Sequence, residues 1–182
     1  QEVSVLFSDL AGFTTFAERS TPAEVATVLN TYYAVAAPLI SRRFGGELEK
    51  FMGDGMMATF NSRGDQPDHA VRAARAALAL QAEIGQLAEQ HPGWPRLRVG
   101  VNSGNAVLRE LGGHGHVAYS LIGDTINAGA RLEGQAPVGA VLIGAETYRQ
   151  LPEGTVVEAM GQVRVKGRSA ALEAYILHTL PN

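Results

Sequence analysis

The stretch VSVLFSDLAGFT, residues 3–14, decides the fold, because it runs an apolar strand directly into an acid and a glycine-containing turn. The alternation of a β-strand places Val3, Val5 and Phe7 on one face. Asp9 ends that face, where burying a carboxylate without a partner costs free energy. Two interpretations stay open from these residues: Asp9 caps the helix that follows, or it binds a ligand.

The turn after this strand is typical of a phosphate contact. Gly12, Phe13 and Thr14 lead from the strand into a helix that we expect over residues 12–18. Backbone N–H groups at the beginning of a helix attract phosphate, so we expect these three residues to contact a phosphorylated substrate. The chain contains no GxxxxGK[ST] pattern, and the turn is therefore not a P-loop.

A second acid, Asp54, lies between two glycines in FMGDGMMATF, residues 51–60. Gly-Asp-Gly between two strand-like runs predicts a hairpin, and an ordinary turn aspartate is the simplest reason for it. If the strand that ends at Asp9 lies beside this hairpin, two carboxylates share one sheet edge. They repel each other unless a cation lies between them. Mg²⁺ suits such a pair when substrate phosphates complete its coordination.

A third segment, GDTINAGARLE at residues 123–133, predicts a helix that carries an amide and a guanidinium. Asn127 and Arg131 are separated by one helical turn and therefore share a face. Such a pair can hold a ribose and a phosphate, although a solvated surface pair is the commoner reason for this spacing. The side chains that we expect to pack inward are those of Ile126, Ala130 and Leu132.

The remaining patterns predict a single α/β or α+β domain over residues 1–182, with one sheet covered by helices. Thr21 and Pro22 mark the beginning of the second helix. The expected strands lie near 3–9, 46–52, 55–60, 97–108, 116–122, 140–143, 155–165 and 172–178. The expected helices lie near 12–18, 22–43, 67–90, 124–135 and 145–150. In the long helix, the expected apolar stripe consists of Val71, Ala74, Leu78 and Ile84.

Composition narrows the function classes. The chain has 182 residues and a net charge of −3, which suits one domain and does not favour a nucleic-acid partner. It contains no cysteine, so disulfides and thiolate metal sites are excluded. No apolar run approaches the roughly 18 residues that span a bilayer. Because the chain begins with Gln1 rather than Met, we expect a domain of a longer protein. The lack of cysteine fits a reducing compartment, so we expect a cytoplasmic domain, with a membrane anchor elsewhere in the parent left open.

Five segments together resemble the catalytic domain of the class III nucleotidyl cyclases. They follow the family's order and cover nearly the whole chain: VLFSDLAGFT, GGELEKFMGDGMMATF, RVGVNSG, YSLIGDTINAGARLE and VKGRSAALEAY. The resemblance implies an α+β sandwich in which a ferredoxin-like mixed β-sheet is flanked by helices. It also implies a homodimer whose two active sites lie at the subunit interface.

The resemblance assigns a role to each candidate residue. Asp9, Asp54 and the carbonyl of Leu10 correspond to the ligands of two divalent ions, Mg²⁺ or Mn²⁺. Asn127 corresponds to the asparagine that orients the ribose. Arg131 corresponds to the arginine that stabilises the transition state, and in this family it comes from the subunit opposite the aspartates.

Two lysines and a serine complete the expected substrate contacts. Lys50 corresponds to the purine-selecting lysine of enzymes that use ATP, and a lysine, which only donates hydrogen bonds, suits the N1 acceptor of adenine. Ser120 stands where adenylate cyclases usually carry Asp or Thr, so discrimination against GTP stays open. Lys166 corresponds to a lysine that holds the terminal phosphates.

These roles predict an adenylate cyclase that converts ATP to 3′,5′-cyclic AMP and pyrophosphate by in-line attack of the ribose 3′ oxygen on the α-phosphate, assisted by two metal ions. One alternative is a catalytically silent nucleotide-binding module that regulates another chain. Another is a diguanylate cyclase, because GGELE at residues 45–49 echoes the signature of that family. Regulatory domains of the parent protein are not identifiable from these residues.

Overall fold

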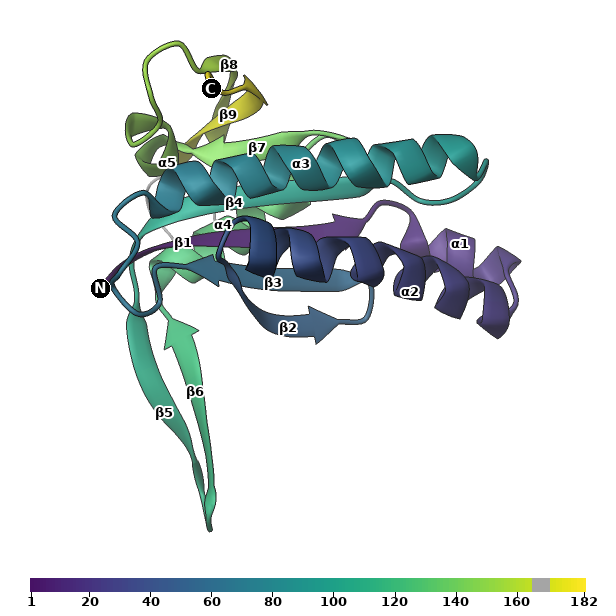
Figure 1. The fold of residues 1–182 in the computed structure, drawn as a ribbon, viewed down its shortest axis with the longest axis horizontal. Coiled ribbons are helices and arrows are strands. Elements are labelled where there is room, and N and C mark those ends of the chain that lie inside the picture. The colour runs from purple at the N-terminus through teal and green to yellow at the C-terminus, as the bar shows by residue number, and fades with distance from the viewer. Residues whose placement is uncertain (165–170) are drawn as a thin grey trace.

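The computed structural model describes residues 1–164 and 171–182, without the side chains of Lys50, Met52, Leu111 and residues 116–119. Its framework is a seven-stranded sheet in the order β2-β3-β1-β4-β7-β9-β8 (Figure 1). The strands are β1 (Glu2–Leu10), β2 (Glu47–Met52), β3 (Gly55–Phe60), β4 (Leu97–Asn105), β5 (Val107–Gly113), β6 (His116–Ile122), β7 (Val141–Gly144), β8 (Val156–Val163) and β9 (Leu172–Thr179). The helices are α1 (Phe13–Arg19), α2 (Pro22–Pro38), the π-helical turn η1 (Leu39–Arg43), α3 (His69–Gln90), α4 (Asp124–Gln135) and α5 (Ala145–Arg149).

Strand β1 lies at the centre of the sheet and fixes the register of its neighbours. It runs antiparallel to β3 and to β4, with Ser8 opposite Met56 and Asp9 opposite Arg98. Strands β4 and β7 are parallel, so the sheet is mixed. The first half of the chain is thus a βαββαβ unit of the ferredoxin-like type, as expected from the sequence. The end of β1 lies between the β2–β3 turn and the beginning of β4.

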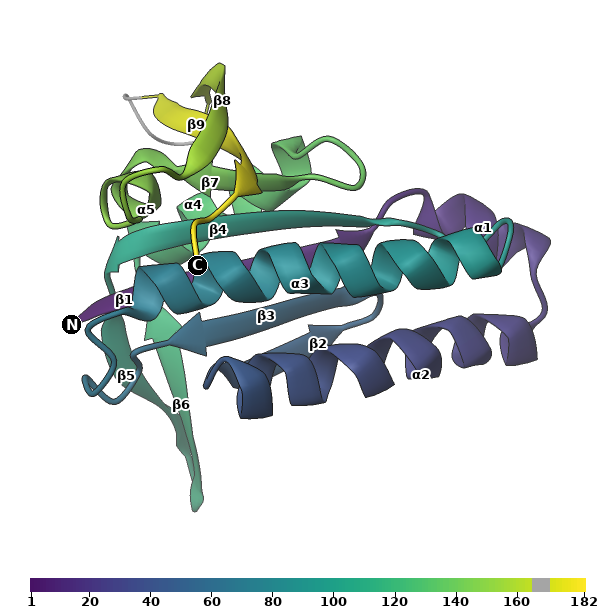
Figure 2. The same ribbon diagram turned by 45° about the horizontal axis from the view of Figure 1, so that its top comes forward.

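Helices cover both faces of this sheet. Figures 1 and 2 show α2 and α3 together on one face and α4 on the other. The α2–α3 face holds the larger core, which contains Leu6, Ile40 and Leu80, all fully buried. The predicted face of β1 is confirmed, because Val3, Val5 and Phe7 form a separate buried cluster against which Ile126 of α4 packs. The α+β sandwich expected from the sequence is therefore confirmed.

Local signals in the sequence place the helices well. Thr21 and Glu24 form a capping box at the beginning of α2, with Pro22 as the first helical residue. In α3 the predicted stripe is partly right, since Ala74 and Ile84 are buried but Val71 and Leu78 are only half-buried. Small side chains occupy the deepest positions instead, namely Ala70, Ala73, Ala76 and Ala77. None of the helices within residues 1–164 and 171–182 combines the length and the apolar content that crossing a bilayer requires.

The predicted strand over residues 97–108 is right as far as Asn105 and wrong beyond it, because the chain leaves the main sheet at Ala106. The N–H of Ala106 donates a 2.8 Å hydrogen bond to the carbonyl of Gln1, and β5 then continues away from the sheet. Strands β5 and β6 form a separate two-stranded sheet that projects from the body (Figures 1 and 2). At its base, Val107 and Leu108 are 55% and 56% exposed, so the hairpin presents apolar side chains to solvent.

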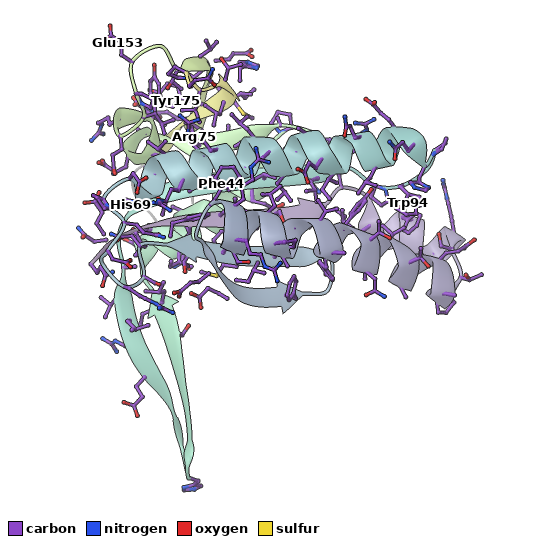
Figure 3. The ribbon with its side chains drawn as sticks, in the orientation of Figure 1. Phe44, His69, Arg75, Trp94, Glu153 and Tyr175 are labelled. Atoms are coloured by element: carbon purple, nitrogen blue, oxygen red, sulfur yellow. The ribbon has the colours of Figure 1, made fainter. Side chains whose placement is uncertain are left out.

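A buried row of hydroxyl groups crosses the sheet near the beginning of β1, at the other end of this strand from Asp9. The Oγ atom of Ser4 lies 2.8 Å from Nδ1 of His69 and 2.6 Å from Oγ of Ser103, which in turn lies 2.8 Å from Oγ1 of Thr147. These links join α3, β1, β4 and α5. Figure 3 shows His69 and Trp94 toward opposite ends of the long helix α3. The hydroxyl row therefore lies far along β1 from the candidate site.

Candidate active site

The structure brings Asp9 and Asp54 to the same end of the sheet. Asp54 lies in the β2–β3 turn, next to the end of β1. The backbone N–H of Leu10 donates a hydrogen bond of 3.1 Å to Oδ2 of Asp54. The residue that follows Asp9 thus holds the second carboxylate, and Leu10 lies between the two acids along the chain.

Asp9 does not cap the helix that follows it. The N-cap of α1 is Gly12, whose φ of +68° is left-handed, and no side chain caps this helix. Instead, Oδ1 of Asp9 accepts a hydrogen bond of 3.3 Å from Nε of Arg98. Both side chains are about one-third exposed, at 31% and 32%, so solvent weakens this ion pair and leaves the carboxylate accessible.

A third carboxyl group, that of Glu133 on α4, lies beside Asp9. Burial, and then the hydrogen bond and negative charge of Asp9, raise the pKa of Glu133 to about 8, while Arg98 opposes this rise. The charge of Asp54 adds to the effect, which places all three carboxyl groups within one electrostatic cluster. The buried Oε1 atom of Glu133 has no hydrogen-bond partner among the described residues.

Helix α4 reaches this cluster because a glycine lets it approach the sheet. A Cβ atom on Gly100 of β4 would lie 2.3 Å from the backbone nitrogen of Glu133 and 2.9 Å from the carbonyl oxygen of Gly129. No side chain larger than hydrogen fits there without moving the helix. The absence of a side chain at Gly100 therefore sets the distance between Glu133 and the end of β1.

The cluster fits a divalent cation with oxygen ligands. It gathers more carboxyl groups than the single guanidinium of Arg98 neutralises, and Glu133 keeps an unpartnered buried oxygen. Asp9, Asp54 and the carbonyl of Leu10 supply the hard oxygen donors that Mg²⁺ and Mn²⁺ prefer. Within residues 1–164 and 171–182, no group of three or more His, Cys, Asp or Glu side chains has the arrangement to hold an ion by itself. Such an ion would therefore bind more tightly when a ligand supplies further oxygens.

The turn at the beginning of α1 presents backbone donors near these acids. The first internal hydrogen bond of the helix runs from the N–H of Phe16 to the carbonyl of Gly12 at 3.0 Å. The N–H groups of Phe13 and Thr14 precede that bond and have no acceptor within the helix. Gly12 and Thr14 are exposed, so their contact with a substrate stays a prediction that the geometry allows.

Asn127 and Arg131 lie on an open face of α4. Asn127 is exposed and Arg131 is half-buried, and neither side chain makes a hydrogen bond or ion pair with another described residue. The expected inward packing is right for Leu132, which is fully buried, and wrong for Ala130, which is exposed. The structure does not bring Asn127 or Arg131 into contact with either aspartate.

The remaining predicted contacts are placed only in part. The backbone of Lys50 pairs with Met57 in the β2–β3 hairpin, while its side chain lies outside the described part of the chain. Ser120 is half-buried in β6, opposite Arg109. Lys166 falls outside the described residues. The roles of these three residues remain predictions.

The acids of the GGELE segment at residues 45–49 have local partners. Glu47 forms an ion pair of 2.8 Å with Arg63, and Glu49 accepts a hydrogen bond of 2.7 Å from Thr59. Both carboxylates are thus satisfied within the β2–β3 region. Nothing in their geometry favours the diguanylate cyclase alternative.

The cavity that Asp54 helps to line is too small for a nucleotide. It is lined by Leu10, Tyr33 and Asp54, among others, and its volume of about 20 Å³ has room for one water molecule. Two larger cavities, of about 210 and 290 Å³, are lined by neither aspartate, nor by Asn127 or Arg131. Among these cavities of the described residues, none combines room for a nucleotide with a lining from Asp9, Asp54, Asn127 or Arg131.

Arg98 and Glu133 are the residues at this site that the sequence patterns did not predict. Arg98 begins the segment RVGVNSG, and only the register of β1 with β4 places it opposite Asp9. Glu133 ends the segment GDTINAGARLE, two residues after Arg131. An acid on the last turns of a helix is ordinarily a solvated residue, so its burial beside Asp9 required the packing of α4 on Gly100.

Known proteins are similar to this chain over nearly its whole length. "Adenylate cyclase 1" of Rhizobium meliloti (strain 1021) is 32% identical over 181 residues, which cover 96% of this chain and 27% of that protein. The crystal structure of the adenylyl cyclase CyaB from P. aeruginosa has a TM-score of 0.91 at 28% identity, covering 99% of this chain and 95% of that one. The guanylate cyclase domain of RhGC from Catenaria anguillulae, in complex with GTP, has a TM-score of 0.88 at 26% identity, covering 100% and 98%.

The chain therefore spans about a quarter of the length of the Rhizobium relative and nearly all of the crystallised domains. Its residues 1–179 match the family described as "Adenylate and Guanylate cyclase catalytic domain". With a ferredoxin-like sheet, two converging aspartates and this match over the whole length, the chain belongs to the class III adenylate and guanylate cyclase catalytic domains.

Proposed function

We propose that this domain converts ATP to 3′,5′-cyclic AMP and pyrophosphate. The ribose 3′ oxygen attacks the α-phosphorus in line with the departing pyrophosphate. The hydrogen bond between the N–H of Leu10 and Asp54 carries this proposal, because it holds the second carboxylate beside Asp9. Two acids in this position are what a pair of phosphate-bound Mg²⁺ or Mn²⁺ ions requires.

Asp9, Asp54 and the Leu10 carbonyl would hold the ions in this reaction. When bound, the ions lower the pKa of the 3′-hydroxyl and offset the charge of the phosphates. The chain's own residues then position the substrate. Arg131 meets the negative charge that develops on the α-phosphate, and Asn127 orients the ribose, which are the contributions that dominate phosphoryl chemistry.

We propose further that two copies of the chain form the site together. Asn127 and Arg131 lie on an open face without partners among the described residues, and the cavity beside the aspartates holds no more than a water molecule. A symmetric dimer would place the α4 face of one subunit against the aspartates of the other, which gives two equal sites. The apolar base of the β5–β6 hairpin supports an interface, because Val107 and Leu108 are exposed in the single chain.

ATP rather than GTP is proposed on the basis of Lys50. A lysine donates to the N1 acceptor of adenine, whereas guanine carries a hydrogen on N1 and favours an acidic partner. Ser120 accepts from the adenine amino group in this proposal, and Lys166 with the turn at Gly12, Phe13 and Thr14 contacts the phosphates. The relatives include both adenylate and guanylate cyclases, so the nucleotide has to be measured.

Product analysis tests the proposal directly. The purified domain is incubated with ATP or GTP and either Mg²⁺ or Mn²⁺, and cyclic AMP and cyclic GMP are separated by chromatography. Asp54→Asn should remove most product, since it weakens the hold on the ions. Asp65→Asn is the matched control, because Asp65 is an exposed acid in a loop elsewhere. A dimeric protein that binds ATP but makes neither product would favour the silent regulatory module instead.

Lys50→Glu tests the choice of purine. The acid should lower the ratio of ATP to GTP turnover by about tenfold or more, because it replaces a donor at N1 with an acceptor. An unchanged ratio would remove Lys50 from the purine site without affecting the rest of the proposal.

A further inference from the structure

The turn that carries Asp54 has few side-chain contacts of its own. Gly53 and Asp54 connect Met52 to Gly55, the last pair of the β2–β3 ladder. Gly53 has a left-handed φ of +61°, and no atom lies within 4 Å of the position that a Cβ would take there. The turn therefore projects into open space, and packing around Gly53 does not fix it.

One hydrogen bond from helix α2 holds this turn in place. The hydroxyl of Tyr33 donates to the carbonyl oxygen of Gly53. The ring of Tyr33 also packs against Phe51 of β2, with a centroid distance of 4.5 Å and an interplanar angle of 56°. Phe51 is itself 50% exposed, so Tyr33 covers part of an apolar side chain next to the turn.

We propose that Tyr33 is a positioning residue for Asp54, which it holds toward Asp9 by fixing the backbone of the β2–β3 turn. The inference rests on the proposed role of Asp54 in binding metal. Asp54 then has two restraints: the N–H of Leu10 orients its carboxylate, and Tyr33 fixes its main chain. Groups that orient a metal ligand typically change affinity without touching the ion.

The environment keeps the Tyr33 hydroxyl a donor. Burial, and then the negative charge of Asp54, raise the pKa of Tyr33 above its ordinary value of 10.0. The hydroxyl thus stays protonated at neutral pH, and a carbonyl oxygen is the acceptor that suits it. Removal of this single oxygen leaves the ring contact with Phe51 intact.

The adjacent residue provides a matched control. Tyr32 donates a hydrogen bond of 2.7 Å to the carbonyl of Pro95 and packs edge-on against Trp94, with ring centroids 5.7 Å apart. It is 4% exposed, so Tyr32→Phe removes an equivalent bond to a backbone carbonyl in the core. Tyr33→Phe makes the same chemical change at the turn.

Titration with Mn²⁺ alone, followed by electron paramagnetic resonance of the free ion, tests the inference on the purified domain. Tyr33→Phe should weaken Mn²⁺ binding by about three- to tenfold, the range expected for loss of one oriented hydrogen bond. Tyr32→Phe should lower the thermal unfolding midpoint and leave Mn²⁺ affinity unchanged. In an Asp54→Asn background, Tyr33→Phe should cause no further loss, because both changes act through the same carboxylate.

The outcomes distinguish failure of the positioning role of Tyr33 from failure of the proposed metal site. Equal Mn²⁺ affinity in the wild type and Tyr33→Phe would overturn the role of Tyr33 while the proposed function stands. An equal loss in Tyr32→Phe, or a full additional loss in the Asp54→Asn background, would show that Tyr33 acts through general stability and would also overturn it. A wild-type domain that binds no Mn²⁺ would instead count against the proposed metal site itself.

Discussion

Two regions of the candidate site differ in whether their side chains find partners within one chain. The first is the carboxylate end of the sheet, with Asp9 and Asp54, and the second is the open face of α4, with Asn127 and Arg131. At the carboxylate end both aspartates have partners within the same chain: Arg98 pairs with Asp9, and Leu10 donates to Asp54. On α4, Asn127 and Arg131 have no hydrogen bond or ion pair with another residue in the described part of the chain.

This difference indicates which part of the site forms when a single chain folds. Strand register and the Gly53–Asp54 turn bring the acids together, so the proposed metal-binding half needs no partner. Arg131 has no acidic partner among the described residues and is held on α4, which makes it a preorganised donor for an anion that arrives from outside. A substitution in one half of the proposed site should therefore leave the other half intact.

The largest effect is expected when two inactive variants are mixed, because the mixture should regain activity only if each site uses both regions. Asp54→Asn and Arg131→Ala should each lower cyclic nucleotide formation by about 100-fold or more, since each removes a group needed in the transition state. Random mixed dimers would contain one intact site, so an equimolar mixture should regain about a quarter of wild-type activity. The rate is measured at equal total protein. No recovery, when native mass spectrometry shows mixed dimers, would contradict a shared site.

Gly100→Ala should have the next largest effect, because it forces the two regions apart. The new Cβ would lie 2.3 Å from the backbone nitrogen of Glu133, so α4 must move or the sheet must distort. We expect the free energy of unfolding to fall by about 3 kcal/mol in urea titrations. Gly134→Ala on α4 is the control, since nothing lies within 4 Å of its Cβ position. That variant should gain up to about 1 kcal/mol from helix propensity.

The fold was predictable where a local signal decides an element. A few adjacent residues determine the capping box at Thr21 and the Gly53–Asp54 turn. The break at Ala106 was not, because the strand pattern continues across it. The contact of this strand with β1 ends there, with a hydrogen bond of 2.8 Å from the N–H of Ala106 to the Gln1 carbonyl. The exposure of Ala130 was also missed, since alanine fits either face of a helix.

The candidate site follows the same division. Asp9 and Asp54 stood out because an acid beside a glycine at the end of a strand needs a reason. Arg98 and Glu133 carry no such signal, because an arginine in a strand and a glutamate near a helix end are ordinary surface residues. Their importance depends on the pairing of β1 with β4 and on the contact at Gly100, which are distant in sequence.

Leu108→Glu tests whether the β5–β6 hairpin forms the interface that brings a second subunit to the α4 face. A charge on this 56% exposed side chain should raise the dissociation constant of the proposed dimer by about tenfold or more, because interface cores exclude charge. Sedimentation velocity over a concentration series measures this. Val156→Glu on β8 is the control, since Val156 is 51% exposed on the opposite edge of the sheet. Similar weakening by both variants would argue against the hairpin as the interface.

The smallest expected effect is a pH dependence of stability that leaves both regions unchanged. Burial lowers the pKa of His69, against the opposing charges of Glu2 and Asp68. At His69 the unfolded chain then binds a proton more readily than the folded one, so the contribution of His69 to stability is full above the ordinary histidine pKa of 6.5 and falls as the pH drops below it. The loss should not exceed about 1.4 kcal/mol per pH unit for one proton.

Urea unfolding at a series of pH values from mildly acidic to neutral measures this slope. His69→Gln should flatten it, although the loss of the bond to Ser4 lowers stability at every pH. His114→Gln, in the exposed turn of the hairpin, should keep the wild-type slope. An equal slope in His69→Gln and the wild type would assign the pH dependence to other groups.

Strands β5 and β6 hydrogen-bond only to each other within the described part of the chain, so each has one outer edge of backbone donors and acceptors facing solvent. A two-stranded ribbon is marginally stable in water by itself, and free edges invite pairing with foreign strands. In the proposed dimer the second subunit would therefore protect this chain from aggregation as well as complete its chemistry. Dilution should loosen the ribbon first, so deuterium uptake in residues 107–113 should rise as the protein concentration falls, while uptake in β1 stays constant.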